Sequence, residues 1–152
     1  MRFLLIAVGR IKPGPLKDLQ RHYAERLTSP VVIREVEERR PLPPAERRER
    51  EGALLLAALP EGATAVALDA GGRSLSSEEL AARISRWREA GAAELAFFIG
   101  GADGLSDAVR RKAELVLSLG PMTWPHLLVR GMLLEQLYRA QQILAGHPYH
   151  RG

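Results

Sequence analysis

The chain has no cysteine and no long hydrophobic run. The lack of cysteine in its 152 residues excludes disulfides, thiolate nucleophiles and cysteine-ligated zinc. The apolar run at residues 3–8 is too short for a signal peptide, and Gly9 and Arg10 follow it instead of a small-residue cleavage site. We also expect no segment to cross a membrane, because no apolar stretch is long enough. These absences predict a cytoplasmic protein.

Positive charge is in modest excess and lies in the first part of the chain. The formal net charge is +4. Residues 1–60 contain twelve Lys and Arg against eight Asp and Glu, whereas residues 61–152 contain ten of each. The length suits one domain over residues 1–152. We expect the basic first part to contact a polyanionic partner and the balanced second part to hold the chemistry.

Strand and helix patterns alternate along the chain. Strands are predicted at 2–8, 31–36, 63–68, 95–99 and 113–119, and helices at 16–27, 45–59, 78–90, 106–112 and 125–144. This alternation predicts an α/β fold with a mainly parallel sheet and helices on both faces. The segment 37–50, rich in charge and proline, is predicted to be a mobile linker or an exposed loop.

Three of the predicted strands end in glycine-containing segments, at 69–73, 100–104 and 120–125. Ligands of such sheets bind beyond the carboxyl ends of the strands, so these three exits predict one pocket. The segment at 100–104 lacks the lysine of a P-loop and the spacing of a dinucleotide motif, and Asp103 would repel phosphate. A cationic or neutral adenosine-type cofactor fits the apolar composition better.

The last residues, 147–151, read His-Pro-Tyr-His-Arg. Chain ends are usually frayed, so a short tail with this many functional side chains is predicted to be ordered and used. His147 and His150 have no adjacent third ligand, and we expect no metal site there. For His126 we favour a hydrogen-bonded neighbour of a helix start over a catalyst.

Four segments of the chain together resemble the RlmH family: 98–106, 117–130, 135–140 and 147–151. Members of this family are SPOUT-class methyltransferases that act on N3 of a pseudouridine in large-subunit (23S) ribosomal RNA. The likeness extends to the opening strand and to Leu68-Asp69, so it covers essentially the whole chain. One turn departs modestly: where the family has Gly-Pro-Glu-Gly, this chain has Gly-Ala-Asp-Gly at 101–104.

The resemblance implies a homodimer with a C-terminal trefoil knot, which no pattern in the sequence indicates. It also implies S-adenosylmethionine as the cofactor and ribosomal RNA or the ribosome as the partner. The cofactor-binding residues that it implies are Leu68, Gly100, Leu119, Gly120, Pro121, Met122, Thr123 and Trp124.

Methylation of N3 requires the loss of an imide proton, hence a base or a cation that stabilises the anion. His150 is a candidate base, and Arg130, Arg139 and Arg151 are candidate cations. His150 and Arg130 are also predicted, with Tyr149 and Arg151, to bind the substrate. The tail is predicted to capture substrate, with Tyr149 stacked on a base and Arg151 at a phosphate. Which of these residues acts, and whether the substrate is free RNA, a subunit or the ribosome, stays open.

Arg130 and Arg139 lie nine residues apart on the last predicted helix, a rotation of about 180°. They would serve one site only if a partner subunit supplied one of them. Tyr138 and Tyr149 are equally compatible with interface aromatics. The same helix carries an apolar stripe that suits either a core or a dimer interface: Leu127, Leu128, Met132, Leu134, Leu137 and Ile143.

Two functions from other classes remain as alternatives. A non-catalytic RNA- or ribosome-binding module would use the basic first part for phosphate contacts and would need no cofactor. A flavodoxin-like enzyme of small molecules is the other, although the glycine-containing turns lack the serine and threonine hydroxyls expected around a flavin phosphate. Binding of S-adenosylmethionine would distinguish a methyltransferase from both of these alternatives.

Overall fold

Five strands pair in parallel in the order β2-β1-β4-β3-β5 in the computed structural model, which describes residues 1–151. Their bounds are β1 Arg2–Val8, β2 Val31–Val36, β3 Thr64–Ser74, β4 Glu94–Ile99 and β5 Leu115–Ser118. All carboxyl ends therefore lie along one edge of the sheet. The predicted α/β fold with a parallel sheet is confirmed.

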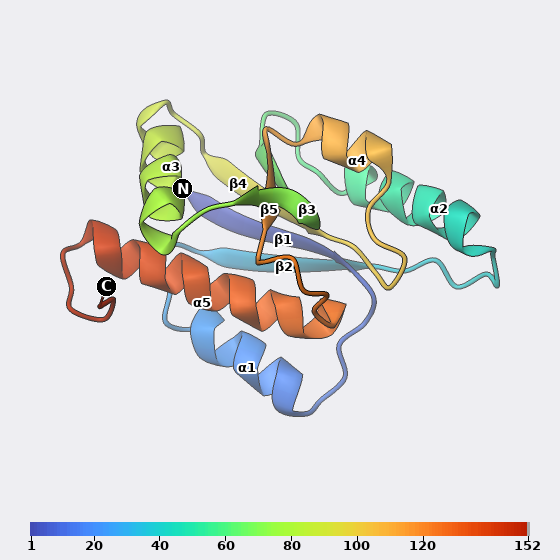
Figure 1. Cartoon of the computed structure of the whole chain (residues 1–152), viewed down its shortest axis with the longest axis horizontal. Helices are drawn as coiled ribbons and strands as arrows, with labels where there is room; N and C mark the ends of the chain where they lie inside the picture. The colour runs from blue at the N-terminus through green and yellow to red at the C-terminus, as the bar shows by residue number, and fades with distance from the viewer. Residues whose placement is uncertain (152) are drawn as a thin grey trace.

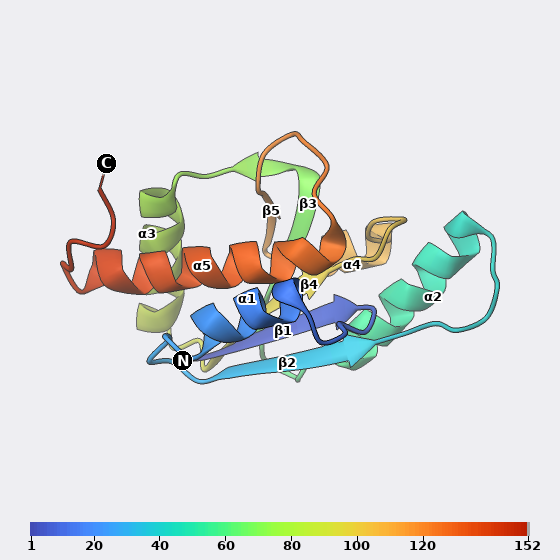
Figure 2. The same cartoon turned by 90° about the horizontal axis from the view of Figure 1, so that it is seen from below.

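Helices cover both faces of the sheet (Figures 1 and 2). One face carries α1 Pro15–Ala24, α3 Ser77–Glu89 and α5 His126–Leu144, and the other carries α2 Pro44–Ala57 and α4 Asp107–Lys112. Helix α5 lies beside α1, and its C-terminal half contacts α3. Helix α3 begins with a capping box, in which Ser76 and Glu79 satisfy each other's backbone N–H groups.

Strand β1 supplies both cores because successive side chains of a strand point to opposite faces. Phe3, Leu5 and Ala7 pack with α3 and α5, whereas Leu4 and Ile6 pack with α2 and α4. The four large residues among them are at most 5% exposed. Burying each such side chain contributes about 1.5–3 kcal/mol, so the central strands hold the sheet edge rigidly in place.

The charged segment 37–50 is a loop only as far as Pro43, so the linker prediction is wrong for its second half. Helix α2 begins at Pro44 with a proline at its first turn, where the missing N–H costs nothing. The helix turns most of its charges outward, Glu51 being the exception at 6% exposure, and its Leu55 into the core, at 1% exposure. High charge density therefore marks the outer face of a helix here.

Strand β3 does not end at Leu68 as predicted. It continues to Ser74, with a shift in its register against β5 between Leu68 and Arg73. The backbones approach so closely that a Cβ atom on Gly72 would lie 2.5 Å from the carbonyl oxygen of Val116. The first glycine-containing exit is therefore a bulged strand and not a free turn.

The remaining boundaries differ by a few residues: α1 ends at Ala24, and β5 is limited to Leu115–Ser118. Within residues 1–151, no helix has the length and apolarity that a membrane crossing requires. The trefoil knot that the family resemblance implies stays a prediction.

Candidate functional site

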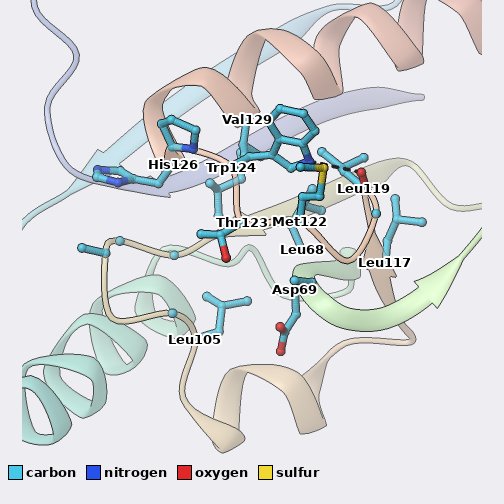
Figure 3. Close-up of a pocket in the computed structure, with 18 residues that line it drawn as sticks. Leu68, Asp69, Leu105, Leu117, Leu119, Met122, Thr123, Trp124, His126 and Val129 are labelled. Atoms are coloured by element: carbon cyan, nitrogen blue, oxygen red, sulfur yellow. Dashed lines mark hydrogen bonds between the residues drawn. The ribbon is translucent and has the colours of Figure 1, made fainter.

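A cavity of about 530 Å³ lies at the carboxyl edge of the sheet, where the three glycine-containing exits meet (Figure 3). Its walls come from β3, the turn after β4, and the loop between β5 and α5. The lining residues are Leu68, Asp69, Ala70, Ile99, Gly100, Gly101, Ala102, Gly104, Leu105, Leu117, Leu119, Gly120, Met122, Thr123, Trp124, Pro125, His126 and Val129. The structure thus brings together every residue of the implied cofactor set except Pro121.

The turn after β4 forms one wall of the cavity and depends on Gly100. A Cβ atom at this position would lie 2.9 Å from the carbonyl carbon of Gly104 and 3.0 Å from its oxygen. The turn is closed by the Gly104 N–H, which donates to the Gly101 carbonyl at 3.1 Å. Glycine is required at position 100 to let the turn fold back on itself.

The loop from Leu119 to Pro125 forms the opposite wall. The Ser118 hydroxyl accepts a hydrogen bond from the Gly120 N–H at 3.0 Å and lies 3.0 Å from the Ala70 carbonyl, which ties this loop to β3. The Trp124 indole donates to the Leu119 carbonyl at 3.3 Å, as Figure 3 shows. Met122 and Trp124 remain 69% and 39% exposed. Large apolar side chains at an open rim are available to cover a ligand.

Ionised groups are few in this cavity. The Asp69 carboxylate points away toward α4 (Figure 3), where Arg110 donates to it at 3.2 Å. Burial, followed by the charge of Arg130, lowers the pKa of His126, which favours the neutral imidazole. Apolar walls with exposed backbone groups suit a flat heterocycle such as adenine and do not suit a polyphosphate.

His126 belongs to the cavity although sequence reasoning gave it a structural role. It occupies the first turn of α5, and its Nε2 lies 3.4 Å from where a Cβ of Gly9 would stand. The position directly after Pro125, at the start of a helix that faces a strand exit, is the signal that could have placed it here.

Arg130 does not lie where substrate can reach it in the described chain, and its prediction as a substrate-binding residue is corrected. Its side chain is 0% exposed and pairs with Glu35 at 2.5 Å. It also donates to the carbonyls of Val8 and Gly9, at 3.3 and 3.0 Å. Burial alone would raise the pKa of Glu35, but the hydrogen bond from Arg130 lowers it. The guanidinium joins α5 to the ends of β1 and β2.

The tail folds back onto α5 and α3 of its own chain. The Tyr149 hydroxyl donates to Glu135 at 3.1 Å, and the Arg139 guanidinium lies 4.8 Å from the Tyr149 ring centroid. His150 contacts Arg139 through Nδ1 at 3.1 Å and Glu78 through Nε2 at 2.5 Å. Burial and the Glu135 charge raise the pKa of Tyr149 to about 12. Arg151 is exposed.

We name Glu78, Glu135, Arg139, Tyr149 and His150 the tail cluster. A second cavity, of about 680 Å³, has Glu135 in its wall and shares Leu117, Leu119 and Gly120 with the first cavity. Among residues 1–151, no member of the tail cluster lines the first cavity. Leu119 and Gly120 thus line both cavities, whereas the tail cluster contributes to the second cavity through Glu135 and does not line the first.

Residues 1–150 match the family model described as "Predicted SPOUT methyltransferase". The chain is 58% identical to the ribosomal RNA large subunit methyltransferase H of Rhodospirillum centenum over 152 residues, the full length of both proteins.

Solved structures share the fold at low identity. A probable methylase family protein from Haemophilus influenzae superposes with a TM-score of 0.57 at 11% identity, over 99% of this chain and 70% of the other. The ribosomal RNA small subunit methyltransferase E from Neisseria gonorrhoeae, bound to S-adenosyl methionine, gives 0.50 at 14% identity, over 95% and 66%.

Proposed function

The chain belongs to the SPOUT methyltransferase family, among the ribosomal RNA large subunit methyltransferase H proteins, and on this premise we propose that it methylates N3 of a pseudouridine in large-subunit ribosomal RNA with S-adenosylmethionine. The observation that carries the proposal is the convergence of Leu68, Gly100 and Met122 on one cavity. These residues come from β3, the turn after β4 and the loop after β5, which are distant in sequence.

The residues of this cavity fit S-adenosylmethionine. The cofactor supplies, when bound, a methyl group on a sulfonium that is its own leaving group. Leu68, Leu119 and Trp124 would pack against the adenosine, while backbone groups of the 119–124 loop would hydrogen-bond the edge of the adenine. The small number of charged groups agrees with a ligand that carries no phosphate.

The protein must also remove the N3 proton and stabilise the resulting negative charge. We assign the proton to His150, which would accept it after releasing Arg139 at Nδ1 or Glu78 at Nε2. Arg139 and Arg151 would supply the positive charge, and Tyr149 would stack on a base. Arg130 is left out of this set because its guanidinium is buried against Glu35.

A second copy of the chain would bring a tail to each cavity. This part of the proposal rests on the separation between the tail cluster and the first cavity. Half-buried apolar residues at the start of α5, Leu127, Leu128 and Met132, together with exposed Trp124, offer a surface for such a homodimer.

Transfer of a labelled methyl group to ribosomes, followed by mass analysis of the nucleosides, tests the activity. We expect one 3-methylpseudouridine in the large-subunit RNA. The absence of S-adenosylmethionine binding at millimolar concentration would overturn the proposal. Cofactor binding without methyl incorporation into free RNA, subunits or ribosomes would retain the site and reject the reaction.

A further inference from the structure

A groove extends from the first cavity past the carboxyl ends of β1 and β2. It consists of two hollows, of about 450 and 780 Å³. The residues common to both hollows are Arg10, Lys12, Glu37 and Arg39. The inner hollow shares Gly101, Ala102 and His126 with the first cavity. We name the two hollows together the β1–β2 groove; its inner end meets the proposed cofactor site.

Five basic residues line this groove, and they come from separate segments of the chain: Arg10, Lys12, Lys17, Arg39 and Arg47. The side chains of Arg10 and Arg39 are 67% and 70% exposed. All five fall within residues 1–60, the part of the sequence that holds the surplus of positive charge. The fold therefore concentrates several of these cations next to the site.

Most carboxylates of the groove already have a basic partner. Glu35 is paired with Arg130, and Asp103 accepts from Arg47 at 3.3 Å. Glu37 lies between two arginines, at 3.9 Å from Arg10 and 3.5 Å from Arg39. Within residues 1–151, neither groove lysine forms a salt bridge. The lining holds as many carboxylates as cations. An outside anion would therefore meet the two lysines, and Arg10 and Arg39, which share the single carboxylate of Glu37.

Glu51 lies in the wall of the inner hollow beside the turn after β4. It is 6% exposed, its two oxygens lie 3.4 Å from where a Cβ of Gly101 would stand, and Oε1 has no hydrogen-bond partner in the described chain. Burial and the charge of Asp103 raise its pKa. Glu51 therefore lies at the junction between the inner hollow and the turn after β4.

We propose that the RNA strand reaches the cofactor cavity along the β1–β2 groove, with Arg10, Lys12 and Arg39 contacting its phosphates. This inference rests on the proposed function and adds the path of the substrate. Exposed arginine and lysine side chains bind phosphate oxygens without reading sequence. The groove would position the strand, while the tail would engage the target nucleotide.

The test replaces Arg10, Lys12 and Arg39 together by alanine. Its control replaces three exposed arginines far from the groove in sequence, Arg86, Arg88 and Arg111, and so removes the same charge. Binding of purified large-subunit RNA and of ribosomes is measured at several salt concentrations, alongside the Kd for S-adenosylmethionine.

We expect the groove variant to bind RNA at least tenfold more weakly than wild type and the control variant. The slope of log Kd against log salt should fall by about 2–3, because each lost phosphate contact contributes about 0.7–0.9. The affinity for S-adenosylmethionine should not change. Equal RNA binding by the two variants would overturn the proposal.

The outcomes separate this proposal from the proposed function. A wild-type protein that binds RNA through the groove but transfers no methyl group would reject only the activity. Binding of both purified RNA and ribosomes that the groove variant retains in full would reject an RNA path through the groove. Normal methylation by the groove variant, at an unchanged KM for RNA, would also reject the groove as the RNA path.

Discussion

The two ends of helix α5 use the same residue type in opposite ways. Near the start of the helix, Arg130 is 0% exposed and joins the core to the ends of β1 and β2 through Glu35 and two carbonyls. Near the end, Arg139 keeps 26% of its side chain exposed and holds Glu135, Tyr149 and His150. The first arginine supports the structure, and the second organises groups that chemistry can use.

This difference shows what helical spacing can and cannot reveal. A separation of nine residues correctly predicts that the two arginines have different surroundings. It does not show that one of those surroundings is the protein interior. Arg130 therefore does not contribute to a site shared between subunits. The proposal of such a shared site depends on the position of the tail alone.

The largest expected effect comes from replacing Arg130. Arg130→Ala removes a fully buried guanidinium and its salt bridge, while Glu35 keeps the Ile11 N–H and is 32% exposed, so the free energy of unfolding should fall by about 3 kcal/mol, the lower end for a broken buried ion pair. Denaturant unfolding measures this loss. Arg139→Ala, the matched variant, should cost about 1 kcal/mol or less because its pair is partly exposed. Similar losses in both variants would erase the contrast between the two ends of α5.

The second effect concerns the tail. His150→Ala should reduce methyl transfer by about 100-fold, the scale of a lost acid–base group, while the Kd for S-adenosylmethionine stays within about twofold of wild type. Arg151→Ala should also reduce methyl transfer, by less than His150→Ala, and should leave the Kd for S-adenosylmethionine unchanged. His22→Ala, at an exposed histidine on α1, is the control and should behave like wild type. A parallel loss of cofactor affinity in His150→Ala would count against a substrate role.

The third effect concerns the turn after β4. Gly100→Val places side-chain atoms against the Gly104 backbone and should weaken S-adenosylmethionine binding by about tenfold or more, equivalent to at least about 1.4 kcal/mol. Calorimetry measures the change. Gly71→Val is the control, since a Cβ there meets only an Asp69 oxygen at 3.8 Å. Unchanged affinity in Gly100→Val would exclude this turn from the cofactor site.

The smallest effect concerns the rim of the cavity. Trp124→Phe removes the hydrogen bond to Leu119 but keeps an aromatic ring, so cofactor affinity should fall by only about fivefold, near 1 kcal/mol. Trp124→Ala also removes the apolar contact and should weaken binding further. Equal affinities of wild type and both variants would show that the rim does not cover the cofactor.

Sequence patterns predicted the sheet and the convergence at its edge because both follow from local rules. Runs such as Leu95–Ile99 identify buried strands, and parallel strands must end at the same edge. The continuation of β3 past Leu68 was missed because its partner is β5, which lies far along the chain. Hydrophobic periodicity carries no information about such long-range pairing.

The site also contains residues that the sequence could predict and residues that it could not. The residues of the cavity could be carried over from a resemblance because they lie in strand exits with distinctive glycines. The burial of Arg130 could not be predicted, since it depends on Glu35, which is 95 residues away in sequence. Nothing in the sequence marks His126 as a cavity residue, because a lone histidine beside a helix start has no distinguishing pattern.

A structure with S-adenosylhomocysteine bound tests the central claim most directly. The account predicts the adenosine in the first cavity, in contact with Leu68, with the turn at Gly100 and with the loop around Met122. Adenosine bound outside this cavity, or in contact with only one of the three strand exits, would contradict it.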